Sequence, residues 1–538
     1  MPLFKKILIA NRGEIALRVM RTCRELGIRT VAVYSDADRE AVHVRSADEA
    51  RWIGAPPPSE SYLSIDRVID AARRSSAEAI HPGYGFLSEN PDLAEACARA
   101  RIVFIGPDAS AMARLGNKLQ ARKLARREGL ETLVGTGHPV RNAAEVRECA
   151  RRWGYPLLLK AAAGGGGRGM RVIRTAEQIE AELRASRGEA RMAFKDPTVY
   201  VERYLERPRH IEIQVLCDRH GTSLALGERE CSIQRRHQKL IEESPSPAVG
   251  RAAVEDAGRK AARMCAQTGY SGAATFEFLM DAQGRLTFME VNTRLQVEHP
   301  VTEARFGVDL VEQQIRIAAG ERLPGWLARR DPRGAAIEVR IYAEDPRRDF
   351  MPDAGLIEVL KLPEGPGVRC DSGVYPGYRV PVEYDPLLAK LITWGQSRPQ
   401  ALSRMRRAIA ECWVGGLHTT LPFLEWTLRD PEFRAGRYST GYVADRWEKR
   451  HEERRIGRGV RARGKPAAVS VLLRAALAVA ALEERRRRRP VAPAPRLSAW
   501  RSVRLRPFPG AAGTWTGLRP SRTRPPRRKR PWRNGALR

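Results

Sequence analysis

The stretch from Pro156 to Ile173, PLLLKAAAGGGGRGMRVI, decides how the chain folds. Its apolar ends, 156–160 and 170–173, predict two buried strands, the first of which delivers Lys160. The four glycines between them lack a Cβ, so their N–H groups can close onto phosphate oxygens while the lysine adds positive charge. Because the lysine precedes the glycines, this is not a Walker A loop. The alternative, a flexible linker, fits poorly between two apolar strands.

A second pattern places two carboxylates on neighbouring strands. The runs 274–280, ATFEFLM, and 286–292, LTFMEVN, flank a turn and predict a hairpin. Burying Glu277 and Glu290 without partners would be costly, and two facing carboxylates suit Mg²⁺ held together with nucleotide phosphates. Asn292 points to the same face as Glu290. Salt bridges from the two glutamates to nearby arginines are the alternative.

Two further segments are dense in polar groups. Arg294, Gln296 and Glu298 alternate within 290–300, EVNTRLQVEHP, so on an extended segment all three would face one way. There they could bind and deprotonate a small oxyanion, the alternative being a solvated strand face. The run 228–239, ERECSIQRRHQK, is basic enough to hold a phosphate and a carboxylate, although in isolation it would suit an exposed basic helix. The sequence contains no HExxH motif, which argues against a zinc site of that type.

The chain has 538 residues, enough for about three or four domains. Apolar runs alternate with helical spacing near the start (6–10, 14–26 and 30–34), which predicts a parallel, doubly wound, Rossmann-like domain over 1–117. Residues 118–334 form a second α/β region. Short β-rich runs followed by a helix at 399–411 predict a compact α+β domain over 335–450.

Most of the formal net charge of +32 belongs to the last part of the chain. Residues 451–538 contain 25 Lys/Arg against 4 Asp/Glu, which leaves +11 for the first 450 residues. This Arg/Pro-rich tail cannot build a core, and we expect it to be disordered or loosely helical. Eight cysteines without a CxxC pair argue against a disulfide scaffold, and the apolar run 469–482 is too short to span a membrane. We therefore expect a cytoplasmic protein with free thiols.

Seven segments together resemble the biotin carboxylase family: ILIANRGEIALRVMRTCRELGI (7–28), HPGYGFLSEN (81–90), KAAAGGGGRGMRV (160–172), ERECSIQRRHQKLIEESP (228–245), GAATFEFL (272–279), MEVNTRLQVEHPVTE (289–303) and IEVRIYAEDP (337–346). The resemblance extends in order from residue 3 to about 443. It implies an ATP-grasp fold over 118–334, with a mobile lid at about 133–205, between an N-terminal Rossmann-like (pre-ATP-grasp) domain and a C-terminal biotin carboxylase domain. The implied reaction phosphorylates bicarbonate with ATP and Mg²⁺ or Mn²⁺, and the carboxyphosphate carboxylates biotin on a carrier protein.

The resemblance also implies a role for each matching residue. The ATP site would comprise Lys118, Lys160, Gly166, Gly167, Met170, Glu202, Arg203, Tyr204, Leu205, His210, Gln234, His237, Glu277, Leu279 and Glu290. The metal would be held by Glu277, Glu290 and Asn292, bicarbonate by Lys239, Arg294, Gln296 and Val297, and biotin by Tyr84 and Arg340. The catalytic residues would be Lys239, Arg294 and Glu298, with Glu298 as the base.

The implied partners are a biotin carboxyl carrier protein, a second copy of the chain and a carboxyltransferase subunit, with no membrane or nucleic acid. Trp413, His418 and Thr420 depart from the family's outline, and no Met-Lys-Met carrier motif occurs, so we expect a stand-alone subunit or a fused one cut short. Another ATP-grasp ligase, making an acyl phosphate for an amine, would share the lysines, the glycine loop and the acid pair but not Arg340 or 81–90. A basic nucleic-acid-binding protein, acting through the tail, is the third interpretation.

Overall fold

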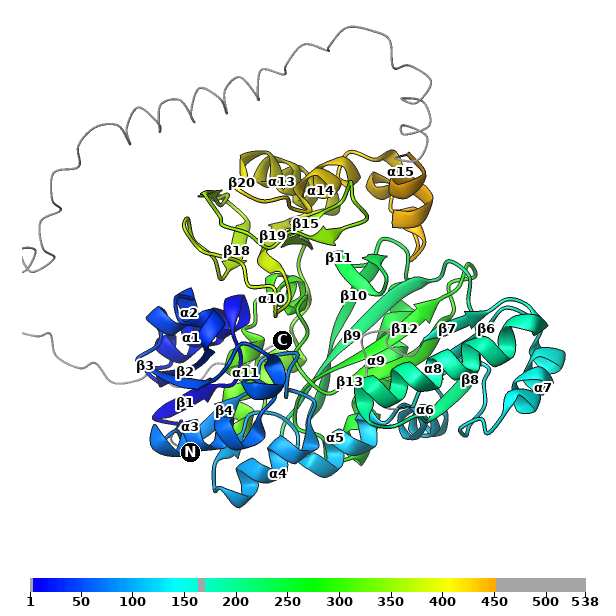
Figure 1. Cartoon of the computed structure of the whole chain (residues 1–538), viewed down its shortest axis with the longest axis horizontal. Helices are drawn as coiled ribbons and strands as arrows, with labels where there is room; N and C mark the ends of the chain where they lie inside the picture. Colours follow the sequence, from blue (N-terminus) through cyan, green and yellow to red (C-terminus); the bar gives the residue numbers. More distant parts are fainter. Residues whose placement is uncertain (1–2, 163–169, 451–538) are drawn as a thin grey trace, which may run out of the picture. The chain divides into compact units, whose positions relative to one another are not determined.

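The computed structural model describes residues 3–162 and 170–450, all within one structural unit (Figure 1). Gly166 and Gly167, together with the tail over 451–538, lie outside the described residues. Within those ranges, no helix is both long enough and apolar enough to cross a membrane.

The N-terminal part folds into a five-stranded parallel sheet in the order β3-β2-β1-β4-β5. Ile7 and Ile9 of β1 pack with the residues of helix α1, while Leu8 packs on the other face with residues of α3 and α4. Helices on both faces explain why β1 is an unbroken apolar run, and the predicted doubly wound sheet is confirmed. Its elements are β1 Lys6–Ile9, α1 Gly13–Glu25, β2 Arg29–Ser35, α2 Val42–Ser46, β3 Glu49–Gly54, α3 Ile65–Arg74, β4 Ala79–His81, α4 Pro91–Arg99 and β5 Val103–Phe104.

The strands on either side of the glycine loop form a small antiparallel sheet, β7-β6-β8, against which two helices pack. Leu157 and Leu159 of β6 face these helices, whereas Leu158 and Lys160 face a cavity. The alternation of a strand therefore delivers Lys160 as predicted. The elements are α7 Ala143–Trp153, β6 Leu157–Ala161, β7 Arg171–Ile173, α8 Ile179–Phe194 and β8 Val199–Arg203.

An eight-stranded antiparallel sheet, β13-β12-β9-β10-β11-β14-β19-β18, runs through the rest of the described chain. Strand β11 pairs with β14, Ile241 opposite Val339, so the second and third sequence regions share this one sheet. Helix α9 (Arg251–Gln267) covers one face of the half that contains β9 and β12, and packs on the residues of these two strands. The strands are β9 Arg209–Cys217, β10 Ser223–Arg235, β11 Gln238–Ser244, β12 Gly272–Met280, β13 Leu286–Asn292, β14 Ala335–Tyr342, β18 Val368–Ser372 and β19 Leu387–Gly395.

The remaining elements surround this sheet (Figure 1). Helices α5 Ala109–Gly116, α6 Lys118–Arg127, α9 Arg251–Gln267, α10 His299–Phe306, α11 Leu310–Ala318 and α12 Gly325–Ala328 belong to the central region. The last region adds β15 Glu344–Asp345, β16 Met351–Pro352, β17 Val359–Lys361, α13 Arg398–Glu411, β20 Trp413–Gly415, α14 Leu421–Thr427 and α15 Pro431–Arg434.

The basic run 228–239 is not a helix. It forms the end of β10, a turn at Arg236 and His237 with positive φ angles (47° and 68°), and the start of β11. The charged residues of this hairpin have partners within the sheet, as when Arg229 donates to Glu212 on the neighbouring β9 at 3.1 Å. Hydrogen bonding to neighbouring strands, which cannot be seen in the sequence of this run alone, makes it a hairpin and not the exposed helix that its composition would suit.

The core around β12 predicts a stability effect. Phe276 is fully buried, with its ring centroid 6.2 Å from that of Phe288 on the neighbouring strand. We expect Phe276→Ala to lower the free energy of unfolding by about 3–5 kcal/mol, because it removes buried surface and leaves a cavity. Urea denaturation measures this. Met192→Ala, at a side chain 82% exposed, is the control and should change little; a similar loss in both variants would contradict the prediction.

Candidate active site

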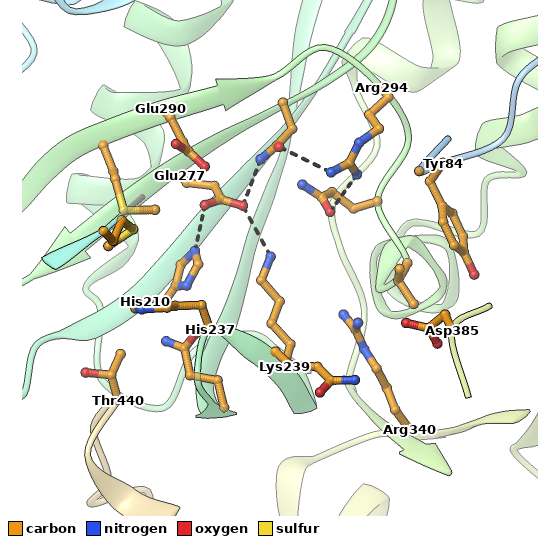
Figure 2. Close-up of a pocket in the computed structure, with 18 of the residues that line it drawn as sticks. Tyr84, His210, His237, Lys239, Glu277, Glu290, Arg294, Arg340, Asp385 and Thr440 are labelled. Carbon is orange, nitrogen blue, oxygen red and sulfur yellow. Dashed lines mark hydrogen bonds and ion pairs between the residues drawn. The ribbon is translucent and has the colours of Figure 1, made fainter. Parts of the chain in front are cut away.

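A cavity of about 650 Å³ is lined by residues from the N-terminal, the central and the last region of the described chain (Figure 2). Every predicted site residue that the structure describes lines it, except Glu298. These residues are Tyr84, Lys118, Lys160, Met170, Glu202, Arg203, Tyr204, Leu205, His210, Gln234, His237, Lys239, Glu277, Leu279, Glu290, Asn292, Arg294, Gln296, Val297 and Arg340. Sequence patterns that lie far apart along the chain therefore converge on one space.

The predicted acid pair lies on adjacent strands. Glu277 of β12 stands directly opposite Glu290 of β13, and Asn292 donates through Nδ2 to Glu277 Oε1 at 2.8 Å. Burial alone would raise the pKa of Glu277, but Lys239 and His210 hold it well below its ordinary range. The two carboxylates, one buried and one nearly so, supply hard oxygen donors of the kind that Mg²⁺ prefers, and the side-chain oxygen of Asn292 lies close by, where it accepts from Arg294 Nη2 at 3.3 Å. Within the described residues, the ion-pair partners of Glu277 and Glu290 are lysines and a histidine, and the alternative of arginine salt bridges is not found there.

The two predicted phosphate lysines approach the cavity from different elements. Lys118, the first residue of α6, lies 2.7 Å from Glu290 Oε2. Lys160 of β6 lies 3.2 Å from Glu202 Oε2, and Glu202 also pairs with the buried Arg122. Each ammonium thus contacts a carboxylate at the cavity wall, which balances the charge of a buried lysine.

Apolar side chains line part of the same cavity. They come from the strands that flank the glycine loop, from the segment after β8 and from the β12–β13 hairpin: Leu158, Met170, Tyr204, Leu205, Leu279 and Met289. Thr440, from the end of the described chain, completes the wall near His210 and His237 (Figure 2). An apolar slot beside a cluster of cations and carboxylates suits a molecule with one flat, weakly polar end and one strongly charged end.

Glu298 lies behind the cavity wall and is fully buried. Its Oε1 accepts from Lys239 Nζ at 2.6 Å, and its Oε2 accepts from Arg340 Nη2 at 3.0 Å. Burial would raise the pKa of Glu298, but Lys239, Arg340 and Arg229 together hold it well below its ordinary range. This carboxylate is therefore ionised at neutral pH and is held between two cations.

The expectation that Arg294, Gln296 and Glu298 share one face of an extended segment is wrong. The chain leaves β13 at Asn292, forms an irregular turn, and reaches Glu298 as the N-cap of α10 with φ −83° and ψ 12°. Arg294 Nη1 still donates to Gln296 Oε1 at 3.1 Å, so these two face the cavity together. Because a helix starts at His299, Glu298 turns inward instead of alternating with them.

Tyr84 and Arg340 lie together at one end of the cavity, near Asp385 (Figure 2). The Tyr84 hydroxyl donates to Glu14, and Arg340 Nη2 lies 2.5 Å from Glu242 Oε1. Burial raises the pKa of Asp385.

The sequence analysis missed several residues of this wall. Asp385 stands in an Asp-Pro pair before a strand, a pattern that indicates only a turn, and nothing in the sequence singles out Thr440. Arg12 and Glu14 belong to the segment NRGE (11–14), which follows the first strand where a doubly wound sheet is expected to bind ligands, but no individual role was predicted for either residue.

Comparisons with known proteins agree with this geometry. Three family models match in order: "Biotin carboxylase, N-terminal domain" over residues 3–112, "Carbamoyl-phosphate synthase L chain, ATP binding domain" over 117–325, and "Biotin carboxylase C-terminal domain" over 338–445. The chain is 50% identical over 442 residues to the biotin carboxylase of Nostoc, covering 82% of this chain and 99% of that protein. It is also 50% identical over 441 residues to a pyruvate carboxylase subunit of Methanothermobacter thermautotrophicus (82% and 90%).

A solved structure is similar over the same region. It is the biotin carboxylase domain dimer of Hydrogenobacter thermophilus 2-oxoglutarate carboxylase in complex with MgADP, ADP and bicarbonate. It matches with a TM-score of 0.81 and 44% identity, covering 83% of this chain and 98% of that one. The ATP-grasp fold class indicated by the sequence is confirmed, and this chain belongs to the biotin carboxylase family.

Proposed function

We propose that this chain is an ATP-dependent biotin carboxylase, which activates bicarbonate with MgATP and passes the carboxyl group to biotin. The observation that carries the proposal is the fully buried carboxylate of Glu298, held between Lys239 and Arg340 beside a cavity that also contains the acid pair Glu277 and Glu290. A base and an anion site lie at one end of that cavity, and a nucleotide and metal site at the other.

The nucleotide would occupy the apolar slot, with its phosphates directed at Lys118 and Lys160. In their present positions both lysines contact carboxylates, so each can exchange one anion for another without becoming an unpaired buried charge. Mg²⁺ or Mn²⁺, held by Glu277 and Glu290 beside Asn292, would neutralise charge on the phosphates when bound.

Bicarbonate would bind among the side chains of Lys239, Arg294 and Gln296 and the backbone of Val297. Glu298 would take the proton of bicarbonate, and the freed oxygen would attack the terminal phosphorus of ATP, breaking its bond to ADP and forming carboxyphosphate. Carboxyphosphate would then give its carboxyl group to a ring nitrogen of biotin: its C–O bond to phosphate breaks, the N–H proton of biotin passes to the released phosphate, and the nitrogen–carbon bond forms. The guanidinium of Arg294 would stabilise the enolate of biotin during this transfer.

Tyr84 and Arg340 would hold the biotin ring. We infer that biotin arrives on a carrier protein, that a separate carboxyltransferase uses the carboxylated biotin, and that the chain pairs with a second copy. The names of the relatives support this, since one is a subunit of pyruvate carboxylase and the similar structure is a dimer.

The description of the central family model also names carbamoyl-phosphate synthase, so the choice of acceptor needs a direct test. We expect free biotin together with bicarbonate to stimulate ATP hydrolysis, measured as ADP release, because Tyr84 and Arg340 offer a ring site beside the base. Ammonia is the control acceptor. Stimulation by ammonia and not by biotin would favour an amine ligase and contradict the proposal.

Substituting the proposed base tests its role. We expect Glu298→Gln to lower bicarbonate-dependent ATP hydrolysis by about 10²–10⁴-fold, because the amide cannot take a proton, while the affinity for MgADP stays close to that of the wild type. Steady-state kinetics and calorimetry measure the two quantities. Glu255→Gln, at an exposed position on α9, is the matched control. Retention of full activity in Glu298→Gln would show that another group removes the proton.

The charges around Glu298 predict a shift in the pH profile. The reaction requires the ionised carboxylate, so its acid limb follows the pKa of this group. Arg340 helps to hold that pKa low, and Arg340→Gln removes its charge, so the pKa should rise and the acid limb should move to higher pH. Bicarbonate-dependent ATP hydrolysis without biotin, followed against pH, measures this. Arg251→Gln, at an exposed arginine, is the control, and an unmoved acid limb in Arg340→Gln would disprove the electrostatic role.

A further inference from the structure

Lys390 is a fully buried lysine that none of the proposed steps uses. It lies on β19, opposite Arg340 of β14 on one side and Asp371 of β18 on the other. It does not line the cavity, so it does not reach a substrate there. A buried ammonium is costly unless it is paired and hydrogen-bonded, so its partners show what it holds in place.

The first partner is the loop that carries the anion site. Lys390 Nζ donates to the backbone carbonyl oxygen of Val297 at 2.8 Å. This carbonyl belongs to the planar peptide group that joins Val297 to Glu298. The hydrogen bond therefore holds the orientation of the backbone at the point where Glu298, the proposed base, begins. Val297 itself lines the cavity. The strand β19 therefore supports, from behind, the segment proposed to bind bicarbonate.

The second partner of Lys390 is Glu14, which contacts Tyr84 at the end of the cavity proposed to bind biotin. Lys390 Nζ lies 3.2 Å from Glu14 Oε1, and the Tyr84 hydroxyl donates to that same carboxylate. The ammonium is also 5.9 Å from the centroid of the Tyr84 ring. Glu14 lies in the first turn of helix α1, and its backbone is closely packed against Gly373, since a Cβ on that glycine would meet the Glu14 nitrogen at 2.7 Å. This packing restricts movement of the Glu14 backbone, so Glu14 cannot shift freely together with Tyr84.

Other acidic groups nearby do not replace Glu14. Asp371 lies opposite Lys390, but its carboxylate is bound by Arg369 at 2.7 Å. Glu338 on β14 has no hydrogen-bond partner for either oxygen within the described residues, and burial raises its pKa well above the ordinary value. Among the side chains that the structure describes, Glu14 is the carboxylate that pairs with Lys390.

We propose that Lys390 is a positioning residue that couples the two ends of the acceptor site, holding the Val297 peptide directly and the Tyr84 hydroxyl through Glu14. This inference rests on the proposed function, because it assigns bicarbonate to the Val297 loop and biotin to Tyr84. One buried cation on β19 sets the relative placement of the two groups that must react, and a small misplacement of reacting groups is expensive in rate.

A double-mutant cycle tests the coupling in the full-length chain. We expect Lys390→Met and Tyr84→Phe each to lower kcat/KM for free biotin, the former by roughly 10- to 100-fold. In the double variant the loss should be no larger than in Lys390→Met alone, because the hydroxyl contributes only while Glu14 is held. Lys390→Met should also raise the KM for bicarbonate and leave MgADP affinity within the error of the wild type. If the loss of kcat/KM in the double variant equals the product of the two single losses, the proposal is wrong. It is also wrong if Lys390→Met lowers the affinity for MgADP by as large a factor as it lowers kcat/KM for biotin. Lys361→Met, at an exposed lysine on β17, is the control.

Two further measurements keep the test decisive. If Lys390→Met does not fold, Glu14→Gln takes its place in the cycle, since it keeps the shape and the Tyr84 contact but removes the ion pair. Crystal structures of the wild type and the variant with MgADP and bicarbonate report positions without turnover. Displacement of the Val297 carbonyl and the Tyr84 ring in the variant supports the coupling, and unchanged positions refute it. An inactive wild-type chain would therefore reject the proposed function while these structures still decide the role of Lys390.

Discussion

The ammonium of Lys239 is the point at which the two ends of the cavity meet. It contacts Glu298 Oε1 at 2.6 Å, Glu277 Oε1 at 3.2 Å and the carboxylate of Glu212. Three buried carboxylates around one cation cannot all carry full charge at low cost. Burial and the charge of Glu298 raise the pKa of Glu212 to about 7, while the pKa values of Glu277 and Glu298 stay well below their ordinary range. One carboxyl group can thus take up a proton near neutral pH, which leaves Glu277 and Glu298 ionised, as their proposed roles at the metal and as the base require.

Strand register produces this arrangement. Glu290, Glu277 and Glu212 lie opposite one another across β13, β12 and β9, and Arg229 of β10 continues the same row. Because side chains alternate along a strand, a slip of one residue in any pairing would move a member of the row to the other face. The continuous sheet then extends through β11 to β14, which places Arg340 beside Glu298. Proposed metal and base sites thus share one framework.

Local patterns in the sequence predicted several of the elements and part of the cavity wall, whereas the other predicted wall residues came from the resemblance to a known family. The strand before the glycines, the hairpin of Glu277 and Glu290 and the parallel N-terminal sheet follow from periodicity within short runs, which the fold preserves. The burial of Glu298 could not be predicted, because it depends on a helix that starts one residue later and on Arg340, which lies 42 positions further along the chain. Lys390 was missed for a related reason: a single cation in an apolar strand acquires meaning only when its cross-strand and cross-domain partners are known.

The low pKa of Glu298 raises a question of chemistry, since a carboxylate stabilised by two cations is a weak base. A general base works best when its pKa lies near the working pH. The positive charge of Lys239, which also donates a hydrogen bond to Glu298, supplies much of the stabilisation, and the same ammonium is proposed to bind bicarbonate. When an arriving anion takes up part of that ammonium's charge and hydrogen-bonding capacity, the pKa of Glu298 must rise. Binding of bicarbonate would thereby make Glu298 a stronger base, whereas without bicarbonate Glu298 would remain a weak base.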